Sequence, residues 1–516
     1  MRRLILISAL LLLPGAALGS PEAAQLFAAN CAECHGEGRL GGTGTALLPE
    51  NLKRLKPAKA KKIVGDGAPA TQMPAFADRL SEPEIDALVG LIYSPLPEVP
   101  EWGMMEIAAS RVVHNDPSAL PDRPVHGADP LNLFTVVETG DHHVTILDGD
   151  RFEPLWRFKS RFALHGGAKY SPDGRFVYLA SRDGWVSKYD LFGLKPVAEV
   201  RAGINTRNIA ISGDGRYLMA ANTLPHTLVV LNTRDMTPNK VIAVADPRGN
   251  TSRVGAVYTA PPRNSFVAAL RDIPEIWMMS YEDNPRPVPL GLVHNYQPGH
   301  EEGLFDRGPF PVRRIKLDDY LDDFFFDQTY ANLVGAARNA RNGQVVNLIV
   351  GRKIADIDLS AMPHLGSGIT FEYRDRRVMA TPHLKGGVVS VIDMETWKTV
   401  KKIETLGPGF FMRSHENTPY AWVDVFFGPH RDAVHVIDKR TLEIVKTLKP
   451  EPGKTAAHVE FTRDGRYALL SIWDMDGALV VYDAATLEEV KRIEMKKPSG
   501  KYNVYNKITY SSGTSH

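Results

Sequence analysis

The feature that most constrains this chain is the pentapeptide Cys31-Ala32-Glu33-Cys34-His35, which has the CxxCH pattern. Two thiols at this spacing can add to both vinyl groups of one haem, and the adjacent histidine is placed to ligate its iron. A redox CxxC or half of a zinc site would require a thioredoxin-like βαβ context or further cysteines, and the chain has no other cysteine. The motif therefore predicts a covalent haem c on Cys31 and Cys34, with His35 as an iron ligand, and electron transfer as the function.

Residues 1–19 have the pattern of a secretory signal peptide. Arg2 and Arg3 give a positive start, residues 4–13 an apolar core, and residues 17–19 a small-residue cleavage site. The apolar run is too short to span a bilayer. Lys and Arg total 61 against 60 Asp and Glu, so charge gives no indication of a nucleic-acid partner. We expect an exported protein without a membrane span, which in a bacterium places it in the periplasm.

The first part of the mature chain, residues 20–94, is predicted to be a small all-α cytochrome c domain. Helices are expected over 23–30, 57–65 and 81–93, and the last has a capping serine followed by proline and acidic residues. The proline-rich stretch that follows is expected to be a stiff linker over 95–110.

A sixth iron ligand is expected in the loop after the second helix. Met73 stands there, where a small cytochrome c supplies its methionine, and Pro74 holds the loop extended. A His/Met iron has a high potential and no open coordination site, which suits electron transfer. Alternatively, Met73 is a core residue and Met104 or Met105 is the ligand.

From residue 111 to 516 the period changes, and strand pairs recur at the spacing of propeller blades. The expected strands include 176–180, 185–190, 227–232, 388–393, 420–424 and 467–472. About eight such units predict an all-β eight-bladed propeller. Turn signals precede several pairs, at 171–175, 212–216 and 462–466. Closure of the ring usually requires strands from both chain ends in one blade, and residues 502–506 are the candidate. An open β-sandwich would not explain so regular a repeat.

The predicted inner strands and their loops are rich in histidine and arginine. One histidine alone is more often structural, but together these residues suit an anionic, metal-bearing ligand on the propeller axis, with arginines for carboxylates and a histidine for iron. The set comprises His165, Arg182, Arg207, Arg253, Arg271, His364, His383, His415 and His458.

Several longer motifs accompany these residues. They are NCAECHG at 30–36, PEWGM at 100–104, YLASRDG at 178–184, PHLGSG at 363–368, TPHL at 381–384, SH at 414–415, ALVVYD at 478–483 and SGKYNVYN at 499–506. In these motifs, over almost the whole mature chain, the protein resembles the cytochrome cd1 family. The resemblance implies a c-type domain followed by an eight-bladed propeller that holds haem d1.

Departures from the family pattern distinguish its branches. CxxCH excludes the branch that lacks a haem c domain. Nitrite reductases usually carry a long segment before the haem motif that can cap the d1 iron, but here the motif begins soon after the predicted cleavage site. In addition, residues 366–368 read Gly-Ser-Gly where the reductases carry Gly-Arg-Gly, and Lys385-Gly386 stands where they carry Gly-Asp. These differences favour the biosynthetic branch, which oxidises dihydro-haem d1 in haem d1 assembly and so serves denitrification.

The resemblance also implies roles for individual residues. His165 is the implied iron ligand of d1, and His364 and His383 are the nominees for a catalytic base. The other implied contacts to the cofactor are Arg182, Arg207, Arg253 and His415. Dihydro-haem d1 would be both ligand and substrate, with its propionate converted to an acrylate. Electrons would pass through haem c to a small cytochrome or cupredoxin.

Two alternatives stay open at this stage. A cd1 nitrite reductase would use His364 and His383 as proton donors while it converts nitrite to nitric oxide. A non-enzymatic carrier would deliver haem d1 to nitrite reductase, and a transient complex with that reductase is also expected of the dehydrogenase. Which histidine is the base, with Tyr420 as a further candidate, cannot be read from spacing.

Overall fold

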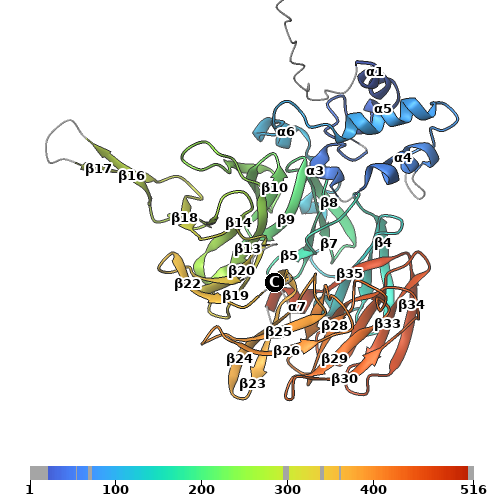
Figure 1. Cartoon of the computed structure of the whole chain (residues 1–516), viewed down its shortest axis with the longest axis vertical. Helices are drawn as coiled ribbons and strands as arrows, with labels where there is room; N and C mark the ends of the chain where they lie inside the picture. Colours follow the sequence, from blue (N-terminus) through green and yellow to red (C-terminus); the bar gives the residue numbers. More distant parts are fainter. Residues whose placement is uncertain are drawn as a thin grey trace, which may run out of the picture. The chain divides into compact units, whose positions relative to one another are not determined.

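A computed structural model of the protein describes residues 21–42, 44–53, 55–67, 73–294, 301–337, 342–359 and 362–509. The chain forms two compact units, Met1–Glu98 and Val99–His516 (Figure 1). The predicted signal peptide, 1–19, lies outside the described residues. Within the described ranges, no helix has the length and apolar character needed to cross a membrane.

The first unit is helical. Its helices are α1 (Pro21–Asn30), α2 (Ala32–His35), α3 (Pro49–Leu52), α4 (Pro57–Asp66) and α5 (Glu82–Tyr93). Phe27 of α1 and Leu88 of α5 are buried in one apolar cluster with Phe76 from the intervening loop. At the start of α5, Glu84 Oε2 accepts hydrogen bonds from Ser81 N and Oγ, both at 2.7 Å, which satisfies an otherwise free helix-end donor. The three predicted helices are therefore present.

In the described residues, the second unit has eight antiparallel blade sheets, seven of four strands and one with a fifth strand at its edge, which we number as blades in chain order. Blade 1 is β35 (Pro498–Asn503), β2 (Leu133–Glu138), β3 (His143–Asp148) and β4 (Glu153–Lys159). Blade 2 is β5 (Lys169–Tyr170), β6 (Phe176–Ala180), β7 (Trp185–Asp190) and β8 (Lys195–Arg201), with β1 (Val112–Val113) at its outer edge. Blade 3 is β9 (Asn205–Ile211), β10 (Tyr217–Leu224), β11 (Thr227–Asn232) and β12 (Pro238–Ala243), and blade 4 is β13 (Val254–Ala260), β14 (Ser265–Leu270), β15 (Glu275–Ser280) and β18 (Val312–Lys316).

The remaining blades follow the same plan. Blade 5 is β19 (Asp323–Phe326), β20 (Asn332–Ala336), β21 (Gly343–Asn347) and β22 (Arg352–Ile357); blade 6 is β23 (Ile369–Tyr373), β24 (Arg376–Pro382), β25 (Val388–Asp393) and β26 (Thr399–Glu404); blade 7 is β27 (Met412–Ser414), β28 (Tyr420–Asp424), β29 (Val434–Asp438) and β30 (Glu443–Leu448); blade 8 is β31 (Ala456–Phe461), β32 (Tyr467–Ile472), β33 (Gly477–Asp483) and β34 (Glu489–Met495).

Shorter elements complete this unit. They are α6 (Met104–Ala109), α7 (Val504–Thr509), the 3₁₀ turns η1 (Pro117–Ala119), η2 (Pro130–Asn132), η3 (Pro261–Arg263) and η4 (Leu365–Ser367), and the hairpin β16 (Val288–His294) and β17 (Glu301–Asp306) inserted in blade 4. Part of the predicted linker 95–110 is thus helical. Ile107 of α6 is fully buried, and Trp102 Nε1 donates to Arg201 O at 2.8 Å. The exact bounds of domains and linker stay a prediction.

The ring is closed by strands from both chain ends. β35 pairs with β2, with Asn503 opposite Phe134 and Lys501 opposite Val136. The prediction of a small cytochrome c domain followed by an eight-bladed propeller is confirmed. The closing strand ends one residue before Val504, where α7 begins, so it covers only the first part of the predicted segment 502–506.

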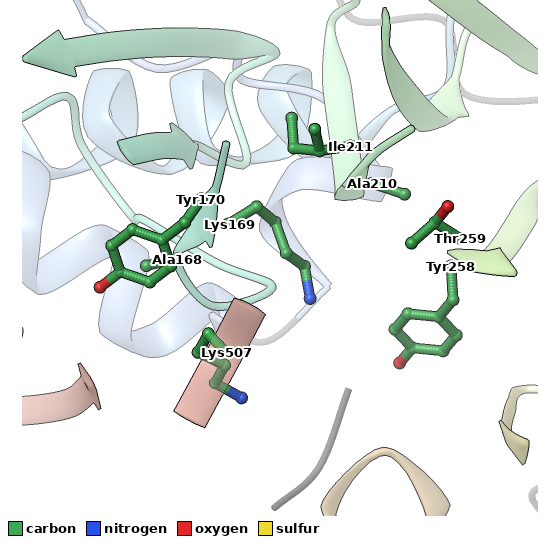
Figure 2. Close-up of a pocket in the computed structure, with 8 residues that line it drawn as sticks. All are labelled: Ala168, Lys169, Tyr170, Ala210, Ile211, Tyr258, Thr259 and Lys507. Carbon is green, nitrogen blue, oxygen red and sulfur yellow. The ribbon is translucent and has the colours of Figure 1, made fainter. Parts of the chain in front are cut away.

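The alternation of strand directions defines two ends of the central channel. Turns between the first and second strands of a blade, such as 171–175 and 212–216, lie at one end, which we call the hairpin end. Turns between second and third strands, such as 181–184, and connections between blades, such as 160–168, lie at the other, the crossover end. A pocket near the hairpin end is lined by β5, β9, β13 and α7 (Figure 2).

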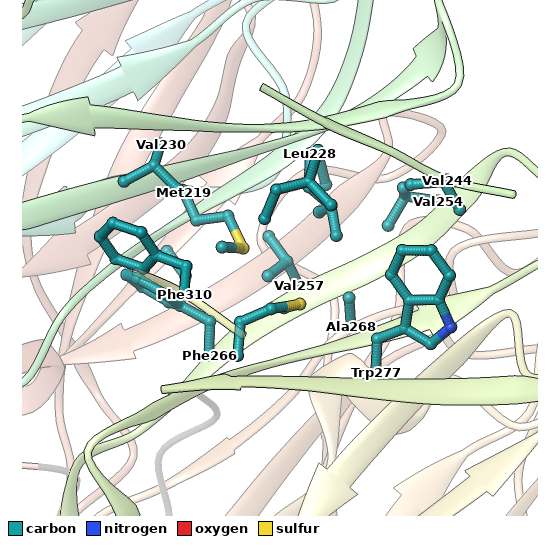
Figure 3. Packing of buried hydrophobic residues seen from close by; sticks show 14 of the residues in the cluster. Met219, Leu228, Val230, Val244, Val254, Val257, Phe266, Ala268, Trp277 and Phe310 are labelled. Atoms are coloured by element: carbon teal, nitrogen blue, oxygen red, sulfur yellow. The ribbon is translucent and has the colours of Figure 1, made fainter. Parts of the chain in front are cut away.

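The core lies between neighbouring blades. Met219 and Val230 of blade 3 pack with Phe266 and Trp277 of blade 4 in one cluster, and all four are at most 1% exposed (Figure 3). Burial of such side chains contributes about 1.5–3 kcal/mol each. Because apolar residues fill the space between sheets, the polar residues of the inner strands are left to line the channel.

Candidate active site

The haem c motif is built around one helical turn. Cys31 N donates to Phe27 O at 2.8 Å and His35 N to Cys31 O at 2.9 Å, so α1 continues almost directly into α2. Residues three and four apart lie on one helix face, which places Cys34 and His35 beside Cys31. Both cysteines are free thiols. This geometry fits two thioether bonds to one haem.

The surroundings of the His35 ring favour its role as a metal ligand. Its Nδ1 lies 2.7 Å from Thr45 O, so Nδ1 carries the proton and Nε2 remains the metal-binding nitrogen. A Cβ on Gly44 would lie only 2.8 Å from the Cε1 atom of His35, so glycine is required for this approach. Burial lowers the pKa of His35, which favours the neutral, ligating form. The residues present therefore fit haem c.

The methionine candidates lie in different elements. Met73 is half-buried in the loop between α4 and α5, and the loop is held where Phe76 N donates to Val64 O and Gly65 O. Met104 and Met105 belong to α6 in the second unit and are 41% and 79% exposed. Met73 stays the predicted sixth ligand.

At the crossover end of the channel, His165 and Arg207 form one hydrogen-bonded unit. His165 Nδ1 lies 2.8 Å from Arg207 O, and Arg207 Nη1 lies 3.1 Å from His165 Nε2. A guanidinium can only donate, so Nε2 is the unprotonated nitrogen, which is the state that binds a metal. Gly166 follows with φ +87°, and a Cβ there would lie 2.7 Å from Asn208 Cβ. The loop thus fits the predicted iron ligand.

The two histidines nominated as the base have different surroundings. His364 Nδ1 bonds to Phe410 O, and the Phe410 ring lies 4.3 Å from the imidazole. Burial lowers the pKa of His364, although Asp323 and the hydrogen bond to Phe410 oppose this effect. His383 follows β24 and is 1% exposed, with its Nε2 2.9 Å from Ser390 Oγ on the neighbouring strand. His364 therefore belongs to the channel, whereas His383 is hydrogen-bonded within blade 6.

The other predicted site residues are distributed over both ends of the channel. Arg182 lies in the turn 181–184 at the crossover end, and its backbone N donates to Ala163 O at 3.1 Å. Arg253 is also at that end, in a bidentate ion pair with Asp272. His415 begins the first turn of blade 7, at the hairpin end, and its ring is packed against Gly465. His415 and His364 therefore lie at opposite ends of the channel.

His458 belongs to the histidine-rich set, although the sequence alone predicts no role for it. It lies on β31 with φ +55°, at a register shift between Ala457 and Val459, and such a bulge redirects a side chain. Its ring lies between Phe411, at 4.6 Å, and Tyr502, at 5.2 Å. Among the residues that the structure describes, neither ring nitrogen has a hydrogen-bond partner. Nothing in the local sequence distinguishes this histidine.

Nearby charges set the protonation state of His458. Burial holds its pKa well below the usual range, and the positive charges of Lys501, Arg413 and Lys507 lower it further. Lys501 Nζ donates to the backbone oxygen of His458 and, at 2.8 Å, to Ser471 Oγ. A neutral imidazole with free nitrogens in a buried channel can accept a proton. Tyr420, the other candidate base, begins β28 at the hairpin end.

Comparison with known proteins agrees with this architecture. The Cytochrome D1 heme domain model matches residues 128–292 and 304–507, and the model of cytochrome C oxidase, cbb3-type, subunit III matches 21–92. A dihydro-heme d1 dehydrogenase of Pseudomonas aeruginosa is 55% identical over 516 residues, with both chains covered fully. A nitrite reductase of Stutzerimonas stutzeri is 25% identical, with 93% of this chain and 92% of the relative covered.

A solved structure, dihydro-heme d1 dehydrogenase NirN in complex with DHE, superposes with a TM-score of 0.88 at 55% identity. The alignment covers 94% of this chain and all of that one. Together with the full-length relative, this likeness places the biosynthetic enzymes nearer to this chain than the nitrite reductase. The chain belongs to the cytochrome D1 heme domain family, as a member that carries an N-terminal cytochrome c domain.

Proposed function

We propose that this protein is a dihydro-haem d1 dehydrogenase that forms haem d1 by oxidising a propionate side chain to an acrylate. The observation that carries the proposal is the buried, neutral His458, whose ring nitrogens have no hydrogen-bond partner in the described part of the chain. Oxidation requires a group that accepts protons. Nitrite reduction requires histidines that are protonated at rest, and burial lowers the pKa of both His458 and His364. The full-length 55% identity to a dehydrogenase supports the same choice.

The reaction balances as a two-electron dehydrogenation. Two C–H bonds of adjacent side-chain carbons break, a carbon–carbon double bond forms, and two electrons and two protons leave. We assign His458 as the acceptor of the proton from the carbon next to the carboxylate, where negative charge develops, and the proton from the other carbon passes to water. Haem c, when bound at Cys31, Cys34 and His35, supplies one-electron redox chemistry, and a soluble small cytochrome or cupredoxin takes the electrons onward.

The other channel residues bind and orient the substrate. His165 offers an unprotonated Nε2 to the substrate iron, and Arg207 beside it can pair with a carboxylate. His364 is fixed by its bond to Phe410 O, with its ring against the same channel. Arg253 is already engaged by Asp272, so we assign it a structural role at the rim.

We further propose that the protein acts in the periplasm, exported by the signal peptide at 1–19, and that it serves denitrification. The covalent haem c and the product support this, because haem d1 is the cofactor of cd1 nitrite reductase. The product must be handed on, so we expect a transient complex with that reductase.

The decisive experiment mixes the haem c-loaded protein with dihydro-haem d1 without oxygen. We expect the visible spectrum to show reduction of haem c, and the extracted tetrapyrrole to lose two mass units. His35→Ala is expected to abolish this turnover and to leave tetrapyrrole binding intact. Binding without a mass change would contradict the dehydrogenase and leave the carrier. Rapid nitrite turnover by the d1-loaded protein would instead favour the reductase.

A further inference from the structure

The lysines of the first unit are confined to one short segment that includes α4 (Figure 1). Residues 21–98 contain five lysines, all of them between Lys53 and Lys62, and no acidic residue stands between Glu50 and Asp66. Acidic residues are spread over the other helices of this unit, in the first turns of α1, α2, α3 and α5. Positive and negative charge are therefore separated along this unit, and the positive part coincides with α4.

The positive charges at the start of α4 oppose the helix dipole. The N-terminus of a helix carries a partial positive charge, so an acidic residue stabilises a helix there and a cation does not. α4 has no acidic residue in its first turn; Lys56 stands at its N-cap without a side-chain capping bond, and Lys59 follows in the first turn. The stability of the helix therefore does not explain the placement of these two lysines.

Lys56, Lys59 and Lys62 together form what we call the α4 lysine face. Lys59 and Lys62 are three residues apart and so lie on one side of the helix, and Lys56 directly precedes it. All three are exposed. Lys62 pairs with Asp66 at 2.5 Å, whereas Lys56 and Lys59 take part in no ion pair with a described residue. The face thus presents positive charge to the solvent.

The opposite side of the same helix packs at the haem c site. Ala60 lies in the apolar cluster of Phe27, and Cys31 packs against that cluster. At the end of α4, a Cβ on Gly67 would lie 3.1 Å from Met73 O, so the helix ends in contact with the segment of the predicted sixth ligand. An α-helix with its side chains is about 10–12 Å thick. Only one helix therefore separates the α4 lysine face from the residues that fit haem c.

No large apolar side chain accompanies these lysines at the surface. Within the described residues of 21–98, every large apolar side chain is buried or half-buried. A contact made on this face would be driven by charge, which favours fast association more than tight binding. This suits a partner that must leave after each electron. It does not suit a membrane, whose binding takes an apolar face or a larger basic cluster.

We propose that the α4 lysine face is the surface on which a soluble electron-transfer protein with an acidic face docks to receive electrons from haem c. The proposal rests on the proposed function, because oxidation of dihydro-haem d1 requires an exit for electrons. Opposite charges steer such encounters and raise association rates by about 10–10³-fold. Each encounter oxidises one reduced haem c and reduces the metal centre of the partner by one electron, so two encounters complete one dehydrogenation.

The test measures reoxidation of haem c in the full-length protein. The protein is reduced with ascorbate, freed of the reductant and mixed with an oxidised acidic cupredoxin in a stopped-flow instrument. We expect Lys56→Glu/Lys59→Glu to lower the second-order rate constant about tenfold or more at an ionic strength of about 0.01 M, where the Debye length is about 30 Å. The difference should vanish at about 1 M, where that length is about 3 Å. Lys56→Arg/Lys59→Arg should react as the wild type does.

The same cupredoxin with redox-inert zinc in place of copper measures binding without electron transfer. Calorimetric titration at low ionic strength should show about tenfold weaker binding by Lys56→Glu/Lys59→Glu. Lys398→Glu/Lys446→Glu is the matched control, because both lysines are exposed residues of the second unit and the change in net charge is the same. The control should keep the wild-type rate and affinity. Glutamates at the start of α4 complement the helix dipole, so the charge-reversed variant should be at least as heat-stable as the wild type.

The docking surface would be overturned by a wild-type rate and affinity in Lys56→Glu/Lys59→Glu, by a loss that persists at high salt, or by an equal loss in the control pair. Lysine-dependent binding to phosphatidylglycerol vesicles, with an unchanged rate toward the cupredoxin, would show a membrane contact instead.

Failure of the proposed function is distinguishable, because chemical reduction replaces the substrate in this test. If the protein does not oxidise dihydro-haem d1 but requires the lysines for electron transfer, the docking surface stands and the proposed function falls. If it oxidises dihydro-haem d1 and the lysine variants transfer electrons normally, only the docking surface falls.

Discussion

Asp424 accepts a hydrogen bond from the backbone N–H of His458, with 3.1 Å between His458 N and Asp424 Oδ2. Its other oxygen, Oδ1, accepts from Phe410 N at 2.7 Å and Phe411 N at 3.0 Å. The carbonyl of Phe410 in turn accepts from His364 Nδ1. One buried carboxylate on blade 7 therefore fixes the backbone of His458 and the segment whose carbonyl holds the ring of His364, although the two histidines come from different blades.

This relationship makes Asp424 a positioning residue. In Asp424→Asn the amide has only one acceptor oxygen, so either His458 N–H or the two phenylalanine amides lose their partner. We expect kcat to fall about tenfold to a hundredfold while KM changes little, since loss of a hydrogen bond to a charged group costs about 1.5–3 kcal/mol. Steady-state kinetics with dihydro-haem d1 and an external oxidant measure both parameters.

Asp438→Asn is the control for that variant. Asp438 also accepts backbone hydrogen bonds in blade 7, from Arg440 N at 2.7 Å and Thr441 N at 3.3 Å, but in the turn after β29. It should lose stability without the change in kcat. Equal kcat values for Asp424→Asn and wild type, or a loss confined to KM, would refute the positioning role.

His458 and His383 can be separated by substitution. His458→Asn is expected to lower the oxidation rate by about 10²–10⁴-fold, the usual contribution of a general base, and to leave tetrapyrrole affinity within a few fold. His383→Asn, whose wild-type ring bonds to Ser390, should cost much less. Single-turnover measurements under saturating substrate compare the two. A larger loss of rate in His383→Asn than in His458→Asn would instead identify His383, which was nominated from the sequence, as the base.

The middle strands were the most predictable part of the fold. β6, β7, β11, β25, β28 and β32 have the predicted bounds, because strands covered on both faces are rich in β-branched, aromatic and other apolar residues. Inner strands carry the functional polar residues, such as Arg207 on β9, and outer strands such as β34 are polar and exposed, so neither shows that pattern.

The site was less predictable because sequence spacing does not show which end of the channel a strand terminus faces. His415 and His364 look equivalent as residues beside strands, yet they lie at opposite ends. Lys169 and Lys501 are charged residues that would be expected in solvent, and only ring closure by β35 buries Lys501. A β-bulge determines the orientation of His458, and no local sequence motif predicts this bulge.

Met73 is expected to determine the potential of haem c. Met73→Ala should convert the six-coordinate haem into a form with an open site and lower its reduction potential, because methionine ligation raises it. Met104→Ala and Met105→Ala are the matched controls, since both side chains lie on α6. Visible spectroscopy and a redox titration report the change. A normal spectrum in Met73→Ala with loss in either control would identify the other methionine as the ligand.

The pH profile tests the protonation state assigned to His458. Because its pKa lies well below the usual histidine value of about 6.5, the base stays neutral and the rate of oxidation should persist as pH falls through that value. The rate should decline only when the lowered pKa is reached. Burial is the largest cause of the shift, followed by Lys501, Arg413 and Lys507, so removal of one positive charge should move the acid limb to higher pH.

Lys501→Gln provides this test, because glutamine keeps a donor for the His458 carbonyl and removes the charge. Lys501 also lowers the pKa of the neighbouring Asp424, which burial raises to about 6, so the profile of Asp424→Asn is measured as well to separate the two groups. Lys188→Gln, which removes a buried lysine outside the channel, should leave the profile unchanged. An acid limb near pH 6.5 in wild type, unmoved by Lys501→Gln, would show that a group other than His458 titrates and that His458 is not the base.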